Sequence, residues 1–285
     1  MTELSNINNT FESYQRLISF YEEHKDKQFQ VIPLSFSSWF AANMCSALAG
    51  LLDKLSENFN EVKIQYIPPL VETILQKNQF LSYFGQPRIA DNYHTTIRFL
   101  KLKPTDGKYF NSYIFHELLG RTELPQMSEM VKGKMAEAIY EIFVNAQIHS
   151  ETPNIYTCGQ FFPHDNKIEF TITDIGIGFK NKINRRFNSN LSSTQAILWA
   201  TQDRNTTKEG IPGGIGLAIL KEFIEKNRGK MQIISDDGFY QIDHRCEQTR
   251  LFNGIFPGTI VNLQFRTDDH SSYILTEEVE NDNIF

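Results

Sequence analysis

Three short groups of residues in this chain have the types and spacing that could do chemistry. In the first group, Glu141 and Asn145 are four positions apart, so on a helix they share one face, one turn apart. The amide oxygen of asparagine can ligate Mg²⁺, and a carboxylate beside it can take a proton from an attacking hydroxyl or water. Glu137 and His149 extend the same stripe. Taken alone, this group is more typical of a solvated polar stripe on an amphipathic helix.

The second group is Asp174-Ile-Gly176-Ile-Gly178, directly after an expected strand at 167–173. A carboxylate at a strand end can accept a hydrogen bond from an exocyclic amine. The two glycines would let the backbone approach a flat ring closely. Alone, the group fits an ordinary turn after a strand equally well.

The third group is Gly213-Gly214-Ile-Gly216-Leu217, which opens an expected helix at 215–227. Glycines before a helix leave backbone N–H groups free to bind phosphate, and the helix dipole favours the negative charge. A flexible glycine linker is the alternative. A Rossmann dinucleotide site is excluded, because the glycines do not follow a strand directly and their spacing is not G-x-G-x-x-G.

In this order the three groups are more specific than any one of them, and together they resemble the boxes of the Bergerat-fold (GHKL) ATPases, which include the histidine kinases. Glu141 to His149 is similar to the N box, Asp174 to Gly178 to the first glycine box, and Gly213 to Leu217 to the second. The similarity covers about 128–267, and its first box is most similar to that of the anti-sigma-factor serine kinases.

The resemblance implies a role for each box. Asn145 would ligate Mg²⁺ on the ATP phosphates, Glu141 would act as the catalytic base, and Asp174 would hold the adenine amino group. The segment 179–212 would be the ATP lid. The other cofactor-binding positions that the resemblance implies are Gly176, Gly178, Gly213, Gly214, Gly216, Leu217, Lys208 and Thr259.

These groups need an α/β scaffold, which the hydrophobic pattern predicts. The expected helices are 11–25, 39–54, 70–78, 110–119, 128–149 and 215–227. The expected strands are 30–34, 62–67, 95–101, 155–162, 167–173, 231–235 and 259–265. Residues 179–212 are rich in Asn, Ser, Thr and basic residues around one apolar helical patch, so a long, partly mobile segment is expected there.

Residues 29–103 weakly resemble a STAS-like domain, the fold of anti-anti-sigma factors. The stretch 40–43 lacks the serine on which such factors are themselves phosphorylated, and Ser37 or Ser38 is expected to cap the helix that follows. The sequence thus predicts a STAS-like α/β unit followed by a two-layer Bergerat-type α/β sandwich with a mixed sheet. The expected division is an N-terminal helix at 1–28, the STAS-like domain at 29–103, a connecting segment at 104–127, the ATP-binding domain at 128–267 and an acidic, loose tail at 268–285.

Composition narrows the class of protein. The 285 residues carry a net charge of −6, which argues against a generally basic nucleic-acid binder. The three cysteines are odd in number and far apart, which favours neither a disulfide framework nor a zinc site and fits a reducing cytoplasm. No signal peptide is expected, and the uncharged stretch 28–52 is interrupted by Pro33 and serines, which disfavours a membrane span.

Two kinds of function stay open. One is an enzyme that hydrolyses ATP or moves its γ-phosphate to a Ser or Thr of a protein partner. The other is a nucleotide-gated interaction module with little turnover. His116-Glu117 echoes the phosphoacceptor box of sensor histidine kinases, but only 29 positions separate His116 from Asn145, which is too short for the helical hairpin of those proteins. A homodimer also stays open.

Overall fold

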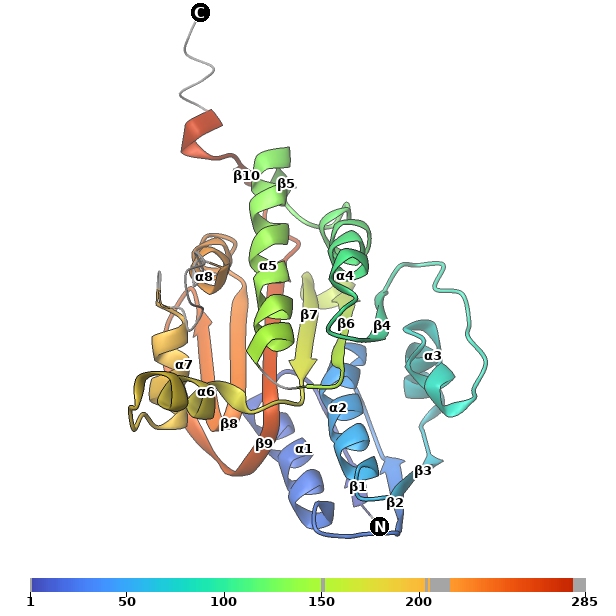
Figure 1. Ribbon diagram of the computed structural model, residues 1–285. Coiled ribbons are helices and arrows are strands. Elements are labelled where there is room, and N and C mark those ends of the chain that lie inside the picture. Colours follow the sequence, from blue (N-terminus) through green and yellow to red (C-terminus); the bar gives the residue numbers. More distant parts are fainter. Residues whose placement is uncertain (1, 150–151, 203–204, 206–215, 279–285) are drawn as a thin grey trace, which may run out of the picture.

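The computed structural model describes residues 2–149, 152–202, 205 and 216–278 of an α/β protein built on a five-stranded sheet (Figure 1). In spatial order, the strands of this sheet are β4 (Thr96–Leu102), β6 (Ile155–Phe162), β7 (Lys167–Asp174), β9 (Glu247–Arg266) and β8 (Lys230–Asp243). Every neighbouring pair is antiparallel, so the expected mixed sheet is wrong for this part of the chain. No helix among the described residues is long and apolar enough to cross a membrane.

The strands β8 and β9 are longer than the sequence predicts, because they bend together. The side-chain amide of Gln232 donates to Oε1 of Gln241 at 2.8 Å, so the two halves of β8 lie side by side around a turn at 235–238. The longer strand β9 follows the outside of this bend, where Phe256 pairs with Asp236. The turn falls at Asp236-Asp237-Gly238, residue types that favour chain reversal.

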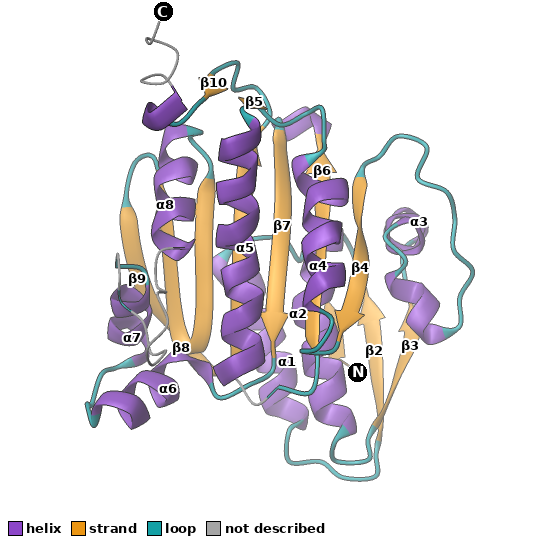
Figure 2. Cartoon of the chain, turned by 45° about the horizontal axis from the view of Figure 1, so that its top comes forward, coloured by secondary structure: helices purple, strands orange, loops and turns teal. Residues whose placement is uncertain are grey.

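Helices of the described chain cover one face of the large sheet, and three of them form most of this layer (Figure 2). They are α4 (Gly107–Tyr113), which continues as a π-helix at Ile114–Leu119, α5 (Glu129–His149) and α8 (Gly216–Lys226). Phe143 of α5 and Phe170 of β7 are fully buried in the core between them. The expected cap is confirmed, since the N–H of Val131 donates to the Ser128 hydroxyl at 3.2 Å.

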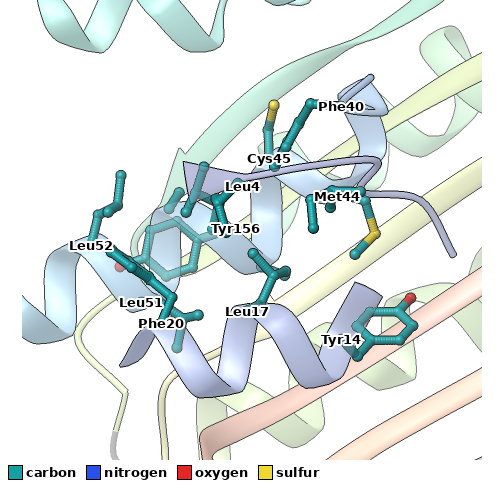
Figure 3. Close-up of a cluster of buried hydrophobic side chains, with 14 of the residues drawn as sticks. Leu4, Tyr14, Leu17, Phe20, Phe40, Met44, Cys45, Leu51, Leu52 and Tyr156 are labelled. Atoms are coloured by element: carbon teal, nitrogen blue, oxygen red, sulfur yellow. The ribbon is translucent and has the colours of Figure 1, made fainter. Parts of the chain in front are cut away.

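The opposite face is covered by the N-terminal part of the chain. Here β1 (Thr2–Leu4), β2 (Val31–Phe36) and β3 (Glu61–Tyr66) form a parallel sheet in this order. The helices α1 (Phe11–His24) and α2 (Cys45–Ser56) connect its strands and lie between this small sheet and the large one. Figure 3 shows Leu4, Leu17, Leu51 and Tyr156 in one cluster, although they come from β1, α1, α2 and β6.

This arrangement changes the expected organisation in three respects. The large sheet carries helices on both faces, so it is not part of a two-layer sandwich. Strand β4 pairs with β6, which puts a strand assigned to the N-terminal unit into the large sheet. Residues 1–28 are not a separate helical segment, because β1 pairs with β2 and α1 joins these two strands.

The start of α2 also differs from the prediction. The helix begins at Cys45, after a short 3-10 turn at Ala42–Met44, so neither Ser37 nor Ser38 caps it. The hydroxyl of Ser38 instead accepts the N–H of Asn6 at 2.7 Å. Ser38 therefore connects the segments that follow β1 and β2, a contact that the local sequence does not predict.

A layer of buried polar side chains joins the N-terminal unit to the large sheet. The carboxylate of Glu169, which is 1% exposed, accepts hydrogen bonds from the amides of Asn9 and Asn262. The amide of Asn43 donates to Asn9 at 2.7 Å and to Thr171 at 3.1 Å. Because buried polar groups are costly when unpaired, this layer fixes how the helices sit on the sheet.

The remaining elements lie at the edges. Helix α3 (Pro69–Lys77) and a 3-10 helix at Phe80–Phe84 follow β3, and β5 (Gln126–Met127) pairs in parallel with β10 (Ser272–Tyr273). The segment expected to be a partly mobile lid contains two helices, α6 (Gly178–Phe187) and α7 (Ser193–Ala200). The tail is held as far as Glu278, whose carboxylate accepts the Ser128 hydroxyl at 2.7 Å, contrary to the expected loose tail.

Candidate functional site

The polar stripe of α5 lies at the border of its buried face. Ile139 and Phe143 are fully buried, while Glu141 and Asn145 on the next side are half-buried. The Oε2 atom of Glu141 accepts the backbone N–H of Gly216, the first residue of α8, at 2.7 Å. The carboxylate therefore interacts with the positive end of a second helix. The side chain of His149 lies outside the described part of the structure.

Asp174 is the last residue of β7, which lies between β6 and β9 in the large sheet. It pairs in register with Thr259 on one side and with Ile155 on the other. Asp174 and Thr259 are each 8% exposed, and the hydroxyl of Thr259 is 3.4 Å from that of Ser235. The strand pairing thus brings together an acid and a hydroxyl that are 85 positions apart in the sequence.

The carboxylate of Asp174 is buried with one oxygen unsatisfied. Its Oδ1 atom is inaccessible and has no hydrogen-bond partner. Burial raises the pKa of Asp174 from 3.8 to about 7, although the backbone N–H of Gly176 and the charge of Lys182 act in the opposite direction. A buried acceptor without a partner is unfavourable by itself, which makes Asp174 a candidate functional residue.

Two glycines near Asp174 allow close contacts that a side chain would prevent. Gly258 has a φ of 149°, and a side chain there would collide with the carbonyl oxygen of Asp174. Gly178 has a φ of 71°, and a Cβ there would lie 2.6 Å from Oδ2 of Asp236. Both positions therefore need glycine for shape as well as for conformation.

The first turn of α6 is held by the bend in β8. The N–H of Phe179 donates to the Ser235 hydroxyl at 2.8 Å, and the carboxylate of Asp236 accepts the N–H of Lys180. Burial raises the pKa of Asp236 to about 6, while this hydrogen bond lowers it in part. These contacts orient α6, so that Phe179 and Lys182 line the space above Asp174.

Two adjoining hollows lie between α5, α6, α8 and the sheet. Both are lined by Ile142, Asn145, Phe179, Lys182 and Leu217. The first hollow is also lined by Glu141, Ile183, Trp199, Ala200 and Asn205. The second is also lined by Ala146, Asp174, Gly178, Thr259 and Val261. We call the two hollows together the α5–α8 cleft.

The cleft brings most of the described candidate residues together. Glu141 and Asn145 line one hollow, and Asn145 also lines the other, together with Asp174, Gly178, Thr259 and Leu217. Gly176 does not line either hollow, but its N–H binds Asp174. Gly216 gives its N–H to Glu141, whereas the resemblance implies a phosphate contact there. Gly213, Gly214 and Lys208 lie outside the described residues.

Several lining residues were not among the candidates. They include Phe179, Lys182 and Trp199, which all lie in the segment 179–212 that the resemblance assigns to the lid. A signal for α6 was present, since Phe179, Ile183 and Phe187 recur at helical spacing. Helix α6 starts at the last glycine of the second group, so this spacing could have placed Phe179 and Lys182 in the cleft.

The cleft combines apolar walls with a small number of polar groups. Ile142, Phe179, Leu217 and Val261 supply apolar walls, and Asp174 supplies a hydrogen-bond acceptor among them. Asn145 and Lys182 supply an amide oxygen and a positive charge next to these groups. Within the described ranges there is no group of three or more His, Cys, Asp or Glu side chains suited to a metal ion.

A cation at Asn145 would therefore take its other ligands from a bound phosphate group and water, which is the usual situation of Mg²⁺ at nucleotide sites.

His116 does not line the cleft. It lies exposed on the π-helix, where its Nδ1 atom is 2.7 Å from the carbonyl oxygen of Ser112.

Comparison of the chain with models of known protein families gives no match, and comparison with curated proteins gives none either.

Proposed function

We propose that the chain binds Mg-ATP in the α5–α8 cleft and hydrolyses it, or transfers its γ-phosphate to a Ser or Thr of a protein partner, as a member of the Bergerat-fold ATPases. The observation that carries the proposal is the unsatisfied Oδ1 of Asp174, buried beside apolar walls at the end of β7. An acceptor in such a slot selects a flat ring that carries an amino group, and adenine is the common biological ring of this kind.

Each end of the nucleotide would have its own set of residues. The adenine would lie near Asp174 and Thr259, against Ile142 and Val261. The phosphates would lie toward Asn145 and Lys182, which line both hollows, and toward Gly216 at the start of α8. Bound Mg²⁺ would neutralise phosphate charge, and Asn145 would hold it in position.

Calorimetric titration with ATP, ADP and GTP in the presence of Mg²⁺ tests the proposal. ATP and ADP should bind, since both carry the adenine amino group. GTP should bind more weakly, because guanine has a carbonyl oxygen where adenine has its amino group, and that oxygen would face the Asp174 carboxylate. Folded protein that gives no heat with ATP would overturn the proposal.

A second function, the nucleotide-gated interaction module, is favoured by the contact between Glu141 and Gly216. A base that is engaged at a helix N-terminus has to leave that contact, or share it, before it can act on a nucleophile. Single-turnover assays with labelled ATP separate the two functions. Phosphate release, or label on a partner, indicates an enzyme, and tight binding without turnover indicates a gated module.

For the N-terminal unit, the STAS-like resemblance stays a prediction. Its support is the alternation of strands and helices from β1 to α3.

A further inference from the structure

Helix α2 of the N-terminal unit lies directly behind the wall of the α5–α8 cleft. Ser46, Gly50 and Asp53 fall at helical spacing and form the face of α2 that contacts β6 and β7 (Figure 3 shows the neighbouring apolar face). The hydroxyl of Ser46 lies 3.2 Å from that of Thr173, and the Tyr156 hydroxyl donates to Asp53 at 2.5 Å. The contact nearest to the cleft is made by Gly50.

Gly50 packs against Ile175, the residue that follows Asp174. A Cβ at Gly50 would lie 2.5 Å from Cδ1 and 2.8 Å from Cγ1 of Ile175, closer than atoms in contact allow. Glycine in the interior of a helix costs about 1 kcal/mol relative to alanine. Its presence here is explained by the close approach of α2 to the turn.

The turn after Asp174 is held from three sides. Gly50 touches the Ile175 side chain, and the N–H of Ile175 donates to the Thr152 hydroxyl at 3.2 Å. On the third side, the backbone of Gly258 lies against the carbonyl of Asp174 and the Cα of Ile175. Ile175 is 6% exposed and belongs to the core that α1 and α2 form with the sheet. Its position therefore depends on where α2 lies.

We propose that α2 is a positioning element of the nucleotide site, and that the Gly50–Ile175 contact sets the turn that carries Asp174 and Gly176. This inference rests on the proposed function and adds that the position of α2 controls nucleotide affinity. A ligand or protein that shifts α2 on the sheet changes the affinity for nucleotide. By linkage, nucleotide then changes the affinity for that ligand by the same factor.

A size-exchange cycle between the two residues tests this proposal. Gly50→Ala adds a methyl group that pushes Ile175 and the turn, and it should weaken ATP binding about tenfold, since overpacked contacts in a core are unfavourable. Ile175→Val removes the Cδ1 atom and should change affinity by less than about threefold. The double variant should regain part of the lost affinity, because the closer of the two crowded atoms, Cδ1, is then absent, while Cγ1 remains next to the added methyl group.

The matched control is Gly133→Ala, a helix-interior glycine in α5 where an added Cβ meets no atom within 4 Å. It should leave ATP affinity unchanged. If Gly50→Ala does not fold, Ile175→Ala removes the contact from the other side and should also weaken binding by about tenfold. Binding is measured by calorimetry, and folding by circular dichroism.

The outcomes separate this inference from the proposed function. If wild-type protein does not bind ATP, the proposed function is overturned, and so is the role of α2 in positioning a nucleotide site. Wild-type protein that binds, together with folded Gly50→Ala protein of equal affinity, overturns the inference alone. A double variant as weak as Gly50→Ala also overturns it, because the effect would then not pass through Ile175.

Discussion

Replacing Asp174 by asparagine should stabilise the protein and weaken nucleotide binding at the same time. The substitution keeps the shape of the side chain and removes its charge. The N–H of Gly176 already binds the carboxylate, so the new amide oxygen would take that bond and the NH₂ group would occupy the place of the unsatisfied Oδ1. A donor would then face the amino group of adenine, which is also a donor.

The expected change in the free energy of unfolding follows from the pKa of Asp174. Burial raises the pKa from 3.8 to about 7, and a rise of that size corresponds to about 4 kcal/mol in the free energy of unfolding. The folded protein therefore holds this proton more tightly than the unfolded chain does, and the free energy of unfolding falls as pH rises from about 4 to about 7. The variant lacks this loss. It should match wild-type protein near about pH 4 and exceed its free energy of unfolding by up to about 4 kcal/mol above about pH 7.

The magnitude on binding follows from the hydrogen bond. A hydrogen bond to a charged acceptor contributes about 1.5–3 kcal/mol, so ATP affinity should fall by about 10- to 150-fold. Wild-type affinity should also weaken below about pH 7, where Asp174 becomes protonated, and that of the variant should not.

Urea unfolding at about pH 5 and about pH 8, combined with ATP titration at about pH 8, measures both effects. The control is Asp165→Asn, at a 62% exposed side chain in the turn between β6 and β7, which should change neither quantity. The reasoning is refuted if Asp174→Asn is less stable than wild-type protein at the higher pH, or if it binds ATP with unchanged affinity.

Three further predictions concern other residues of the cleft. Glu141→Gln keeps an oxygen that can accept the Gly216 N–H but cannot take a proton, so ATP binding should persist while single-turnover phosphate release falls at least about 100-fold; unchanged release would exclude Glu141 as the base. Asn145→Ala should abolish the difference in ATP affinity between Mg²⁺ and a chelator, as measured by calorimetry, and a preserved difference would place the ion elsewhere. Gly258→Ala should lower the free energy of unfolding by more than about 2 kcal/mol, because its φ is 149° and a Cβ would collide with Asp174; a near-normal melting temperature would contradict this.

Some of the positions that meet in the cleft could be found from sequence because they are set by local chemistry. Asn145 follows Glu141 by one helical turn and Asp174 ends a strand, whereas Thr259 is implied only by the resemblance and lies inside β9. Such short patterns can be recognised in the sequence without knowing how distant segments pack. The structure places Asn145, Asp174 and Thr259 around one hollow, and their roles toward a nucleotide stay predictions.

The features that sequence did not predict depend on contacts between distant segments. Strand β4 belongs to the large sheet because it pairs with β6, more than fifty positions away, and no local pattern encodes that partner. The start of α2 was misplaced because Ser38 binds Asn6, not the helix. For α6 the polar composition predicted part of a long, partly mobile segment, although Ile183 is buried and Phe179 is half-buried on one side of a helix.

Helices on both sides of the large sheet limit how this protein can assemble. The side opposite α5 is occupied by α1 and α2, and buried hydrogen bonds from Asn9 to Glu169 and from Asn43 to Thr171 hold this part of the chain on the sheet. Two copies therefore cannot stack sheet against sheet through that side. A dimer of this chain would have to form through outer helices, strand borders or the small parallel sheet. In a dimer through the outer helices or the small sheet, the symmetry axis would lie at least one helical layer away from the strand that carries Asp174.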